Sequence, residues 1–202
     1  MKYLFAAISC LITTVSLAQQ NYIVQLGDSS YDVSLDSAYQ VMLHGKKVKL
    51  TIKQKPILTF QDTLFSFSYP QGFQVTETNI DSNVNQYLAL TADATGFILQ
   101  AYRTINPDGL NELMLREVTK ENMSYGYTMK REDTTRTLRS GQKVTVNKAV
   151  LTFKDDKYTF EVMSIGSRDE GILVITIDGG LDYTGKGKEM IKLLWDSLRY
   201  NK

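Results

Sequence analysis

Short runs in which apolar and polar residues alternate recur along most of this chain, and Gly, Asp and Ser separate them. An alternation with a period of two places the apolar side chains on one face of an extended strand, and the separating residues favour tight turns. Residues 22–54 alone contain four such runs, which predict a meander of short hairpins. This pattern restricts the chain to folds built mainly from antiparallel strands.

Two segments depart from the alternation and predict helices. Asn106-Pro107-Asp108 provides a capping side chain and a proline for the first turn of a helix that runs to about Met123. The expected core face of this helix comprises Leu110, Leu113, Met114 and Val118. In the C-terminal helix the expected core face comprises Met190, Ile191, Leu194, Trp195 and Leu198.

Between the two helices, residues 125–138, 144–153, 158–165 and 172–177 predict long strands. The last of these is apolar on both faces, so we expect it at the centre of a sheet that is covered on both sides. The resulting class is α+β, with antiparallel strands and two helices. Pro56 ends the N-terminal meander, so residues 19–56 are expected to form a small β-hairpin appendage and residues 57–202 the main domain.

The first eighteen residues have the features of an export signal. Lys2 precedes a short apolar stretch, and Ser16-Leu17-Ala18 offers small residues at the positions that a signal peptidase reads. We therefore expect cleavage after Ala18 and a periplasmic or extracellular mature protein. Cys10 is the only cysteine, so the mature chain has no thiol. The alternative is a lipoprotein signal that ends at Cys10, but the apolar stretch before that residue is short for this purpose.

The charge balance limits the partners that can be expected. The chain has 23 Lys and Arg against 22 Asp and Glu. Because Lys2 belongs to the expected signal, the mature chain is neutral overall, which gives no electrostatic attraction to nucleic acid. No apolar run after the signal reaches the ~18 residues of a membrane-spanning helix. We therefore expect no nucleic-acid partner and no transmembrane segment.

Two short motifs resemble catalytic ones but lack the context that the chemistry requires. Residues 180–187 differ by one residue from a phosphate-binding P-loop, because Gly187 replaces the Ser or Thr that holds magnesium. They lie between a strand and the last helix, outside any parallel βαβ unit, so we expect a glycine loop without nucleotide. Ser140-Gly141-Gln142-Lys143 matches S-x-x-K, but Ser140 falls in a predicted turn and Lys143 in a predicted strand, which separates the two side chains.

Few residues could hold a metal or act as a general base. His44 is the only histidine, and Gly45 behind it predicts an exposed hairpin turn. A zinc site would have at most one ligand of its favoured type. Asp155-Asp156 and Asp169-Glu170 are expected in solvated turns. We therefore assign no catalytic, cofactor or metal residue, while a carboxylate pair drawn from distant parts of the chain, as in glycosidases, stays open.

A cluster of lysines is the one distinctive surface feature. Residues 46–55 contain five lysines and no acid. In a strand over 47–55, one face would carry Lys47, Lys49, Lys53 and Lys55, which we call the lysine stripe, and the other face would be apolar. The stripe could bind an anionic lipid, a glycan or an acidic partner. The favoured alternative is an edge strand whose lysines prevent pairing with other strands.

A run at the start of the main domain has a distinctive order of residues: Phe65-Ser66-Phe67-Ser68-Tyr69-Pro70-Gln71-Gly72-Phe73. It is similar to the opening of the PsbP-like family and its DcrB-type relatives, in which a strand is followed by Tyr-Pro, Gly and an aromatic residue. The later helix, the 144–177 meander and the last helix with Leu194-Trp195 follow in the family's order over about residues 60–200. The resemblance implies a curved antiparallel sheet flanked by helices. It also implies an assembly factor, accessory subunit or chaperone-like binder without catalysis or cofactor, and it carries over no site residue.

These observations favour an exported, non-enzymatic protein that binds or helps to assemble a component of the cell envelope. Its partner would be an unknown protein or another envelope component. Two alternatives stay open: a secreted hydrolase that acts on glycan or peptide through a carboxylate pair, and a structural partner subunit. A concave pocket with converging carboxylates would favour the hydrolase, and an exposed apolar groove would favour the binder.

Overall fold

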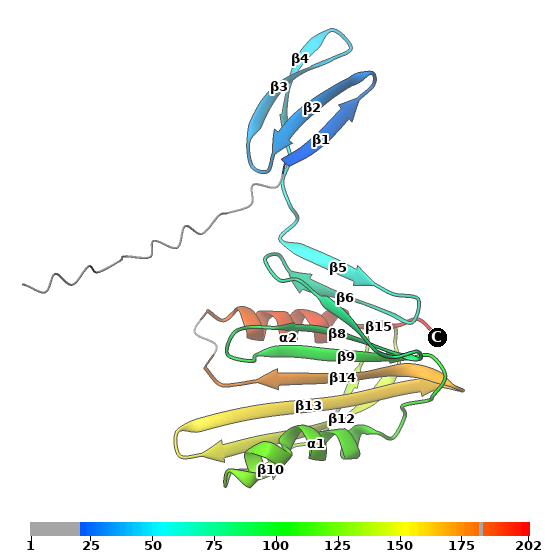
Figure 1. The fold of residues 1–202 in the computed structure, drawn as a ribbon, viewed down its shortest axis with the longest axis vertical. Coiled ribbons are helices and arrows are strands. Elements are labelled where there is room, and N and C mark those ends of the chain that lie inside the picture. The colour runs from blue at the N-terminus through cyan, green and yellow to red at the C-terminus, as the bar shows by residue number, and fades with distance from the viewer. Residues whose placement is uncertain (1–20, 182–183) are drawn as a thin grey trace, which may run out of the picture. The chain divides into compact units, whose positions relative to one another are not determined.

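The structure is a computed structural model that describes residues 21–181 and 184–202. The expected signal at 1–18, with Cys10 and the cleavage site after Ala18, lies outside the described residues. The described chain divides between Gln54 and Lys55 into two compact units (Figure 1). From the sequence alone, the corresponding boundary was expected at Pro56.

The smaller unit consists of two hairpins. β1 (Asn21–Leu26) pairs with β2 (Ser29–Ser34), and β3 (Ala38–Leu43) pairs with β4 (Lys46–Thr51). His44 and Gly45 form the turn between β3 and β4, and both have positive φ, +48° and +75°. Such a turn matches the twist of the two strands. The backbone N–H of Ser34 donates to the Tyr39 hydroxyl at 2.7 Å, which connects the two hairpins around the buried Val33 and Val41.

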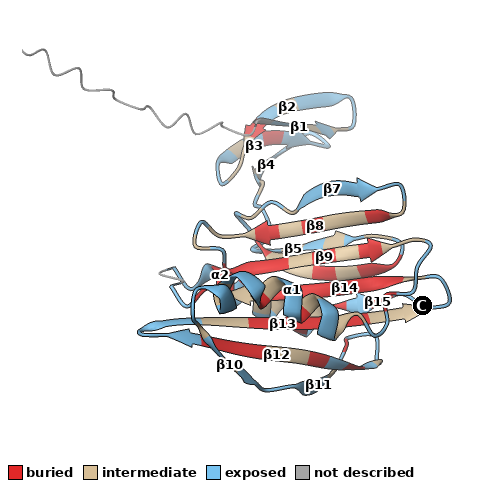
Figure 2. Ribbon diagram, turned by 60° about the horizontal axis from the view of Figure 1, so that its bottom comes forward, coloured by how far each residue is buried: buried red, intermediate tan, exposed pale blue. Residues whose placement is uncertain are grey.

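The larger unit is built on a main antiparallel sheet. Among the described residues its strand order is β10-β12-β13-β14-β9-β8-β7, with β11 also paired to β12. The strands are β7 (Thr76–Asp81), β8 (Val84–Leu90), β9 (Gly96–Tyr102), β10 (Thr128–Arg131), β11 (Thr134–Thr137), β12 (Lys143–Phe153), β13 (Asp156–Ser167) and β14 (Glu170–Asp178). As expected, β14 lies inside the sheet, between β13 and β9, and residues 171–176 are all buried (Figure 2).

The two faces of the main sheet carry separate hydrophobic cores. Side chains alternate along β14, so Val174 belongs to one core, whereas Leu173 and Ile175 belong to the other. The helix α1 (Asn111–Ser124) packs over β12 and β13 and buries Leu115 in the second core. The first core is covered by the helix α2 (Lys186–Ser197) and by a small sheet. That sheet consists of β5 (Ile57–Gln61), β6 (Phe65–Pro70) and β15 (Arg199–Tyr200).

These antiparallel strands and two helices confirm the main elements of the α+β prediction. Neither described helix has the length and apolar character needed to cross a membrane.

The first helix begins later than the sequence predicts. The side chain of Asn106 accepts the N–H of Asp108 at 2.9 Å and so forms a turn of its own, and Gly109 has a φ of +88°, so the helix begins at Asn111. The predicted core face was also partly wrong, because Leu113 is 45% exposed and the buried positions are Leu115 and Thr119.

The predicted strand over 125–138 is divided into β10 and β11. Both segments keep one register along β12, with Arg131 opposite Ala149 and Thr134 opposite Val146. Between them, the side chain of Asp133 accepts the N–H of Lys148 at 2.9 Å. Because a side-chain oxygen takes this donor, the regular backbone ladder is interrupted there.

Candidate functional site: a polar groove beside the C-terminal helix

The sheet face that carries α2 changes from apolar to polar along the central strands. In the register of the sheet, Lys148, Glu161 and Thr176 form one row across β12, β13 and β14. In the next row, Thr159 lies opposite Asp178. Further along the same strands and on the same face, Met163 and Val174 lie in the first core. The polar rows therefore lie at one end of this core.

The helix α2 supplies the other wall. Lys188, Lys192 and Asp196 are spaced by four residues, as are Ile191 and Trp195, so each set lies along one side of the helix. Together with Arg136 from β11, these residues and the two polar rows line a groove of about 410 Å³. We refer to it as the α2 groove.

A charged pair lies at the bottom of the α2 groove. The guanidinium of Arg136 donates to both carboxylate oxygens of Glu161, at 2.7 and 2.9 Å. It also lies 4.5 Å from the ring centre of Trp195, where a cation is attracted by the aromatic face. Glu161 is only 7% exposed and accepts a further bond from the Thr176 hydroxyl at 3.4 Å. Without Arg136, the buried carboxylate of Glu161 would lack its cation, so this contact connects β11 to β13.

The other carboxylates of the α2 groove also contact basic side chains. Lys188 lies 3.6 Å from Asp178, and Lys192 pairs with Asp196 one helical turn away. These pairs are more exposed than the Arg136–Glu161 pair, so water and salt weaken them. The ring N–H of Trp195 is buried without a hydrogen-bond partner among the described residues. The α2 groove thus presents charges of both signs and exchangeable ion pairs.

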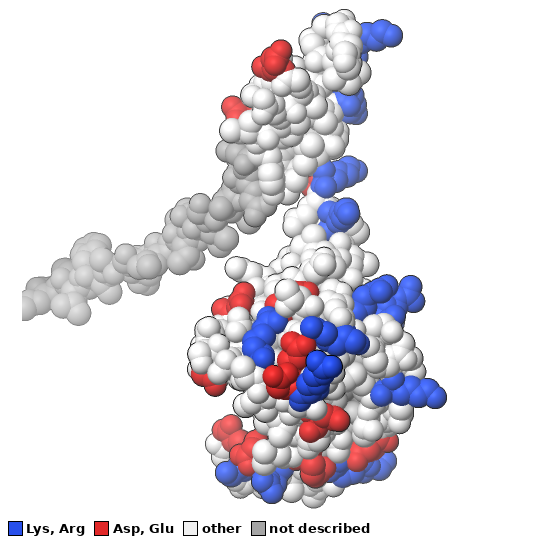
Figure 3. Space-filling model, turned by 90° about the vertical axis from the view of Figure 1, so that its right-hand side faces the viewer, with Lys and Arg blue, Asp and Glu red and all other residues white. Residues whose placement is uncertain are grey.

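The structure brings together only part of the predicted lysine stripe. Lys47 and Lys49 share one face of β4, but the strand ends at Thr51, so Lys53 and Lys55 lie beyond it. Lys55 belongs to the larger unit. On the face drawn in Figure 3, the visible basic side chains of the smaller unit lie at its right and most of the visible acidic ones at its left. The binding role of Lys47, Lys49, Lys53 and Lys55 stays a prediction.

Residues of both catalytic-like motifs make structural contacts. Gly180 and Gly185 have positive φ, and a Cβ at Gly187 would lie 2.6 Å from a methyl group of Thr95, so helix α2 packs closely on the turn before β9. Asp182 and Tyr183 of this motif lie outside the described residues. Ser140 lies in the turn before β12 and its hydroxyl accepts the N–H of Tyr200 at 2.9 Å.

The acidic pairs named from the sequence lie at opposite ends of β13. Asp155 and Asp156 lie at its start, and Asp169 and Glu170 follow its end. His44 is exposed in its turn, as predicted. Among residues 21–181 and 184–202, no group of three or more His, Cys, Asp and Glu could hold a metal ion.

Two other carboxylates, which the sequence did not single out, meet around Tyr87. Its hydroxyl lies 3.3 Å from Asp62 and 3.2 Å from Glu77. Burial and the two carboxylates raise the pKa of Tyr87 to about 12. Burial opposes ionisation of Asp62, but the N–H of Leu64 and the Arg103 guanidinium outweigh it and lower the pKa of this carboxyl. We refer to these residues as the Tyr87 cluster.

Comparison with known proteins gives a weak likeness of fold. No protein-family model matches the chain, and no curated protein matches it in sequence. The solution structure of cyanobacterial PsbP from Synechocystis is similar at 13% identity and a TM-score of 0.46, over 72% of this chain and 92% of that protein. A protein from Bacteroides thetaiotaomicron is similar at 15% identity and a TM-score of 0.34, over 71% of this chain and 48% of that one. The expected resemblance to PsbP is confirmed at this level.

Proposed function

We propose that the protein is an exported, non-enzymatic binding or assembly protein of the cell envelope, and that the α2 groove contacts its partner. The main sheet would serve as the curved, helix-flanked scaffold of this groove. The export signal expected at residues 1–18 supports the location.

One observation carries the proposal: all three carboxylates that line the α2 groove are paired with basic side chains of the protein itself. Glu161 pairs with Arg136, Asp178 with Lys188, and Asp196 with Lys192. A general acid must carry a proton and a nucleophile must reach its substrate, and both are hindered when a carboxylate is held by a cation. A partner surface with charges of both signs can instead exchange with the two exposed pairs, which gives specificity without chemistry.

The Tyr87 cluster is the observation that favours the alternative of a hydrolase, because it brings two carboxylates together. However, the hydroxyl of Tyr87 lies within hydrogen-bond distance of both Asp62 and Glu77. It therefore occupies the space that a glycosidic bond or a water would need. Arg103 also pairs with Asp62 at 2.7 Å. The arrangement thus supports a structural role for the cluster.

Site-specific cross-linking from the α2 groove tests the proposal. A photo-reactive side chain at Lys192 of the full chain, expressed in its native host, should yield one adduct of defined mass. Lys130 on β10 is the matched control, because it does not line the α2 groove and its side chain is 77% exposed against 75% for Lys192. The adduct should appear from position 192 only, and Lys188→Glu should abolish it. Equal adducts from both positions, or an adduct that resists Lys188→Glu, would contradict the role of the α2 groove.

A second assay separates binding from hydrolysis. The purified mature protein and its Asp62→Asn variant can be incubated with envelope glycan and with peptide substrates. We expect no products from either protein. Products released by the wild type and lost in Asp62→Asn would establish the hydrolase instead.

A further inference from the structure

A second groove lies between helix α1 and the short strand β10. Leu115, Thr119 and Met123 are spaced by four residues and share one side of α1, and Met129 of β10 lies across from them. Together with Glu112, Arg116, Lys120 and Arg131 they line a cavity of about 280 Å³. We refer to it as the α1 groove.

The floor of the α1 groove is apolar. Leu115 is 1% exposed, and Thr119 donates its hydroxyl back to the Leu115 carbonyl at 2.7 Å, so this hydroxyl is already satisfied. Met123 is 41% exposed although it is apolar. Methionine side chains are flexible and polarisable, so they adapt to apolar ligands of different shape.

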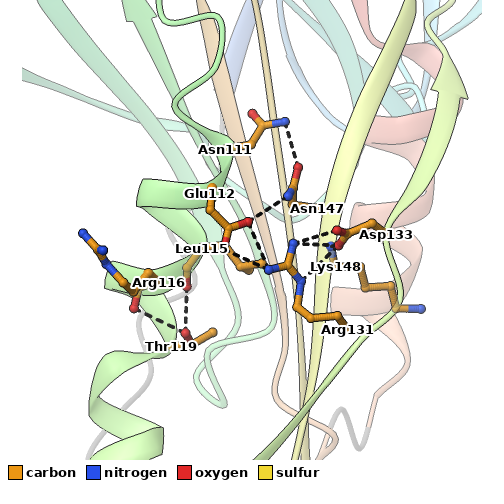
Figure 4. Close-up of polar contacts among 9 residues, drawn as sticks. All are labelled: Asn111, Glu112, Leu115, Arg116, Thr119, Arg131, Asp133, Asn147 and Lys148. Carbon is orange, nitrogen blue, oxygen red and sulfur yellow. Dashed lines mark hydrogen bonds and ion pairs between the residues drawn. The ribbon is translucent and has the colours of Figure 1, made fainter.

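One end of the α1 groove is fixed by ion pairs. Arg131 lies between Glu112 and Asp133, donating to Glu112 at 3.0 Å and to Asp133 at 2.7 Å (Figure 4). Glu112 also accepts a bond from Asn147 at 3.1 Å. These contacts hold β10 in place. Because the charges of Arg131 and Glu112 already compensate each other, neither side chain requires a charged group of a ligand as its partner.

The outer rim carries two cations with weak contacts. The side chains of Arg116 and Lys120 are 71% and 75% exposed, and both lie near Glu117 at 3.7 and 3.8 Å. Exposed pairs at such distances contribute little to stability, so both cations can turn to another anion at small cost.

We propose that the α1 groove binds an anionic single-chain amphiphile of the fatty-acid class. The acyl chain lies on Leu115, Met123 and Met129, and the acid group meets Arg116 and Lys120. The apolar floor excludes a purely polar ligand, the rim charge favours an anion over a cation, and the volume suits one chain rather than two. This site is separate from the α2 groove and does not depend on its partner.

Titration with dodecanoate below its micellar concentration tests the proposal. The mature full chain should bind about one equivalent, observed by calorimetry, and the methyl NMR signals of Met123 and Met129 should shift. Arg116→Ala with Lys120→Ala should weaken binding at least ~10-fold at low salt, where screening is small. The matched control, Lys154→Ala with Lys157→Ala, removes two exposed lysines that line neither groove and should leave the affinity unchanged.

Other probes decide between possible occupants. Dodecyltrimethylammonium, which has the same chain and the opposite charge, should bind at least ~10-fold more weakly. Met123→Glu places a carboxylate in the exposed part of the floor, and it should abolish dodecanoate binding while the unfolding midpoint stays within the range of surface substitutions. Equal affinity for both amphiphiles, unchanged affinity in the rim variant, or a response only to an acidic amphipathic peptide would overturn the proposal.

Discussion

At the scale of single residues, Tyr87 has the most unusual environment. Its side chain is 2% exposed, and its hydroxyl contacts two carboxylates although it has only one proton to donate. Burial disfavours the charged phenolate, and ionisation would also place a negative charge beside Asp62 and Glu77, so the pKa rises to about 12.

The raised pKa predicts a loss of stability at alkaline pH. The folded state holds the phenol proton more tightly than the unfolded state. The contribution of Tyr87 to the free energy of unfolding is therefore complete below its ordinary pKa of ~10 and is lost as the pH rises to about 12. One proton gives a slope of at most ~1.4 kcal/mol per pH unit. Urea unfolding of wild type and Tyr87→Phe at several pH values measures how the free energy of unfolding changes with pH.

The comparison with Tyr87→Phe also provides the control. Burial raises the pKa of Tyr102 and of Tyr200 as well, but both proteins contain them, so the difference isolates Tyr87. The free energies of unfolding of wild type and Tyr87→Phe should converge above pH ~10. Parallel curves across this range would show that the hydroxyl does not stay protonated in the folded protein.

At the scale of elements, the backbone at the start of β9 lies very close to two other segments. Gly96 has a φ of +152°, and a Cβ there would lie 2.1 Å from the carbonyl oxygen of Ala89 and 2.7 Å from the Met190 methyl group. Because Gly96 has no side chain, a short turn can join β8 to β9 while α2 packs closely against β9.

Gly96→Ala should destabilise the larger unit by more than ~3 kcal/mol, because the added carbon meets backbone that cannot move freely. Gly141→Ala is the matched control, since Gly141 also has a positive φ, +100°, but has nothing within 4 Å of its added Cβ. That variant should lose only the ~1–2 kcal/mol of a left-handed alanine. Denaturant unfolding measures both, and equal losses would refute the packing argument.

The position of β4 bears on the two interpretations of the lysine stripe, which are edge protection and anion binding. β4 pairs only with β3 among the described strands, so Lys47 and Lys49 lie on an edge strand. Replacing Lys47, Lys49, Lys53 and Lys55 with Gln should leave the fold intact but increase self-association, measured by sedimentation. The Lys47 and Lys49 changes should account for most of the effect, because the other two lysines lie outside the strand.

The control removes four exposed lysines of the larger unit, Lys120, Lys130, Lys154 and Lys157, so that net charge falls equally. It should not increase self-association. Wild type should not bind anionic vesicles. The stripe is a binding site if wild type co-sediments with these vesicles at low salt and dissociates from them at ~0.15 M salt, while the stripe variant does not bind them at either salt concentration.

At the scale of the whole molecule, export predicts a defined mature N-terminus. Ser16-Leu17-Ala18 follows the apolar stretch, so cleavage should leave Gln19 as the first residue and a chain without thiol. Intact mass of the protein recovered from its host measures this. A mass that corresponds to a chain starting at a lipid-modified Cys10 would contradict both statements.

The features that depend on neighbouring residues could be predicted from the amino-acid sequence. Alternation with turn residues between the runs predicted the four strands of the smaller unit, the run at 172–177 predicted the interior strand β14, and His44-Gly45 predicted an exposed turn. Each of these follows from side-chain periodicity or local backbone preference, and such terms act within a few residues.

The features that join distant segments depend on the tertiary structure. Gly166 of β13 lies opposite Gly171 of β14, and the absence of side chains there leaves space for Asn106 and Pro107. The helix α1 begins only after this contact and after the positive φ of Gly109. The α2 groove depends on the register that aligns Lys148, Glu161 and Thr176. The meeting of Asp62, Glu77 and Tyr87 depends in the same way on strand pairing. Register and packing join residues far apart in the chain, so no local pattern contains them.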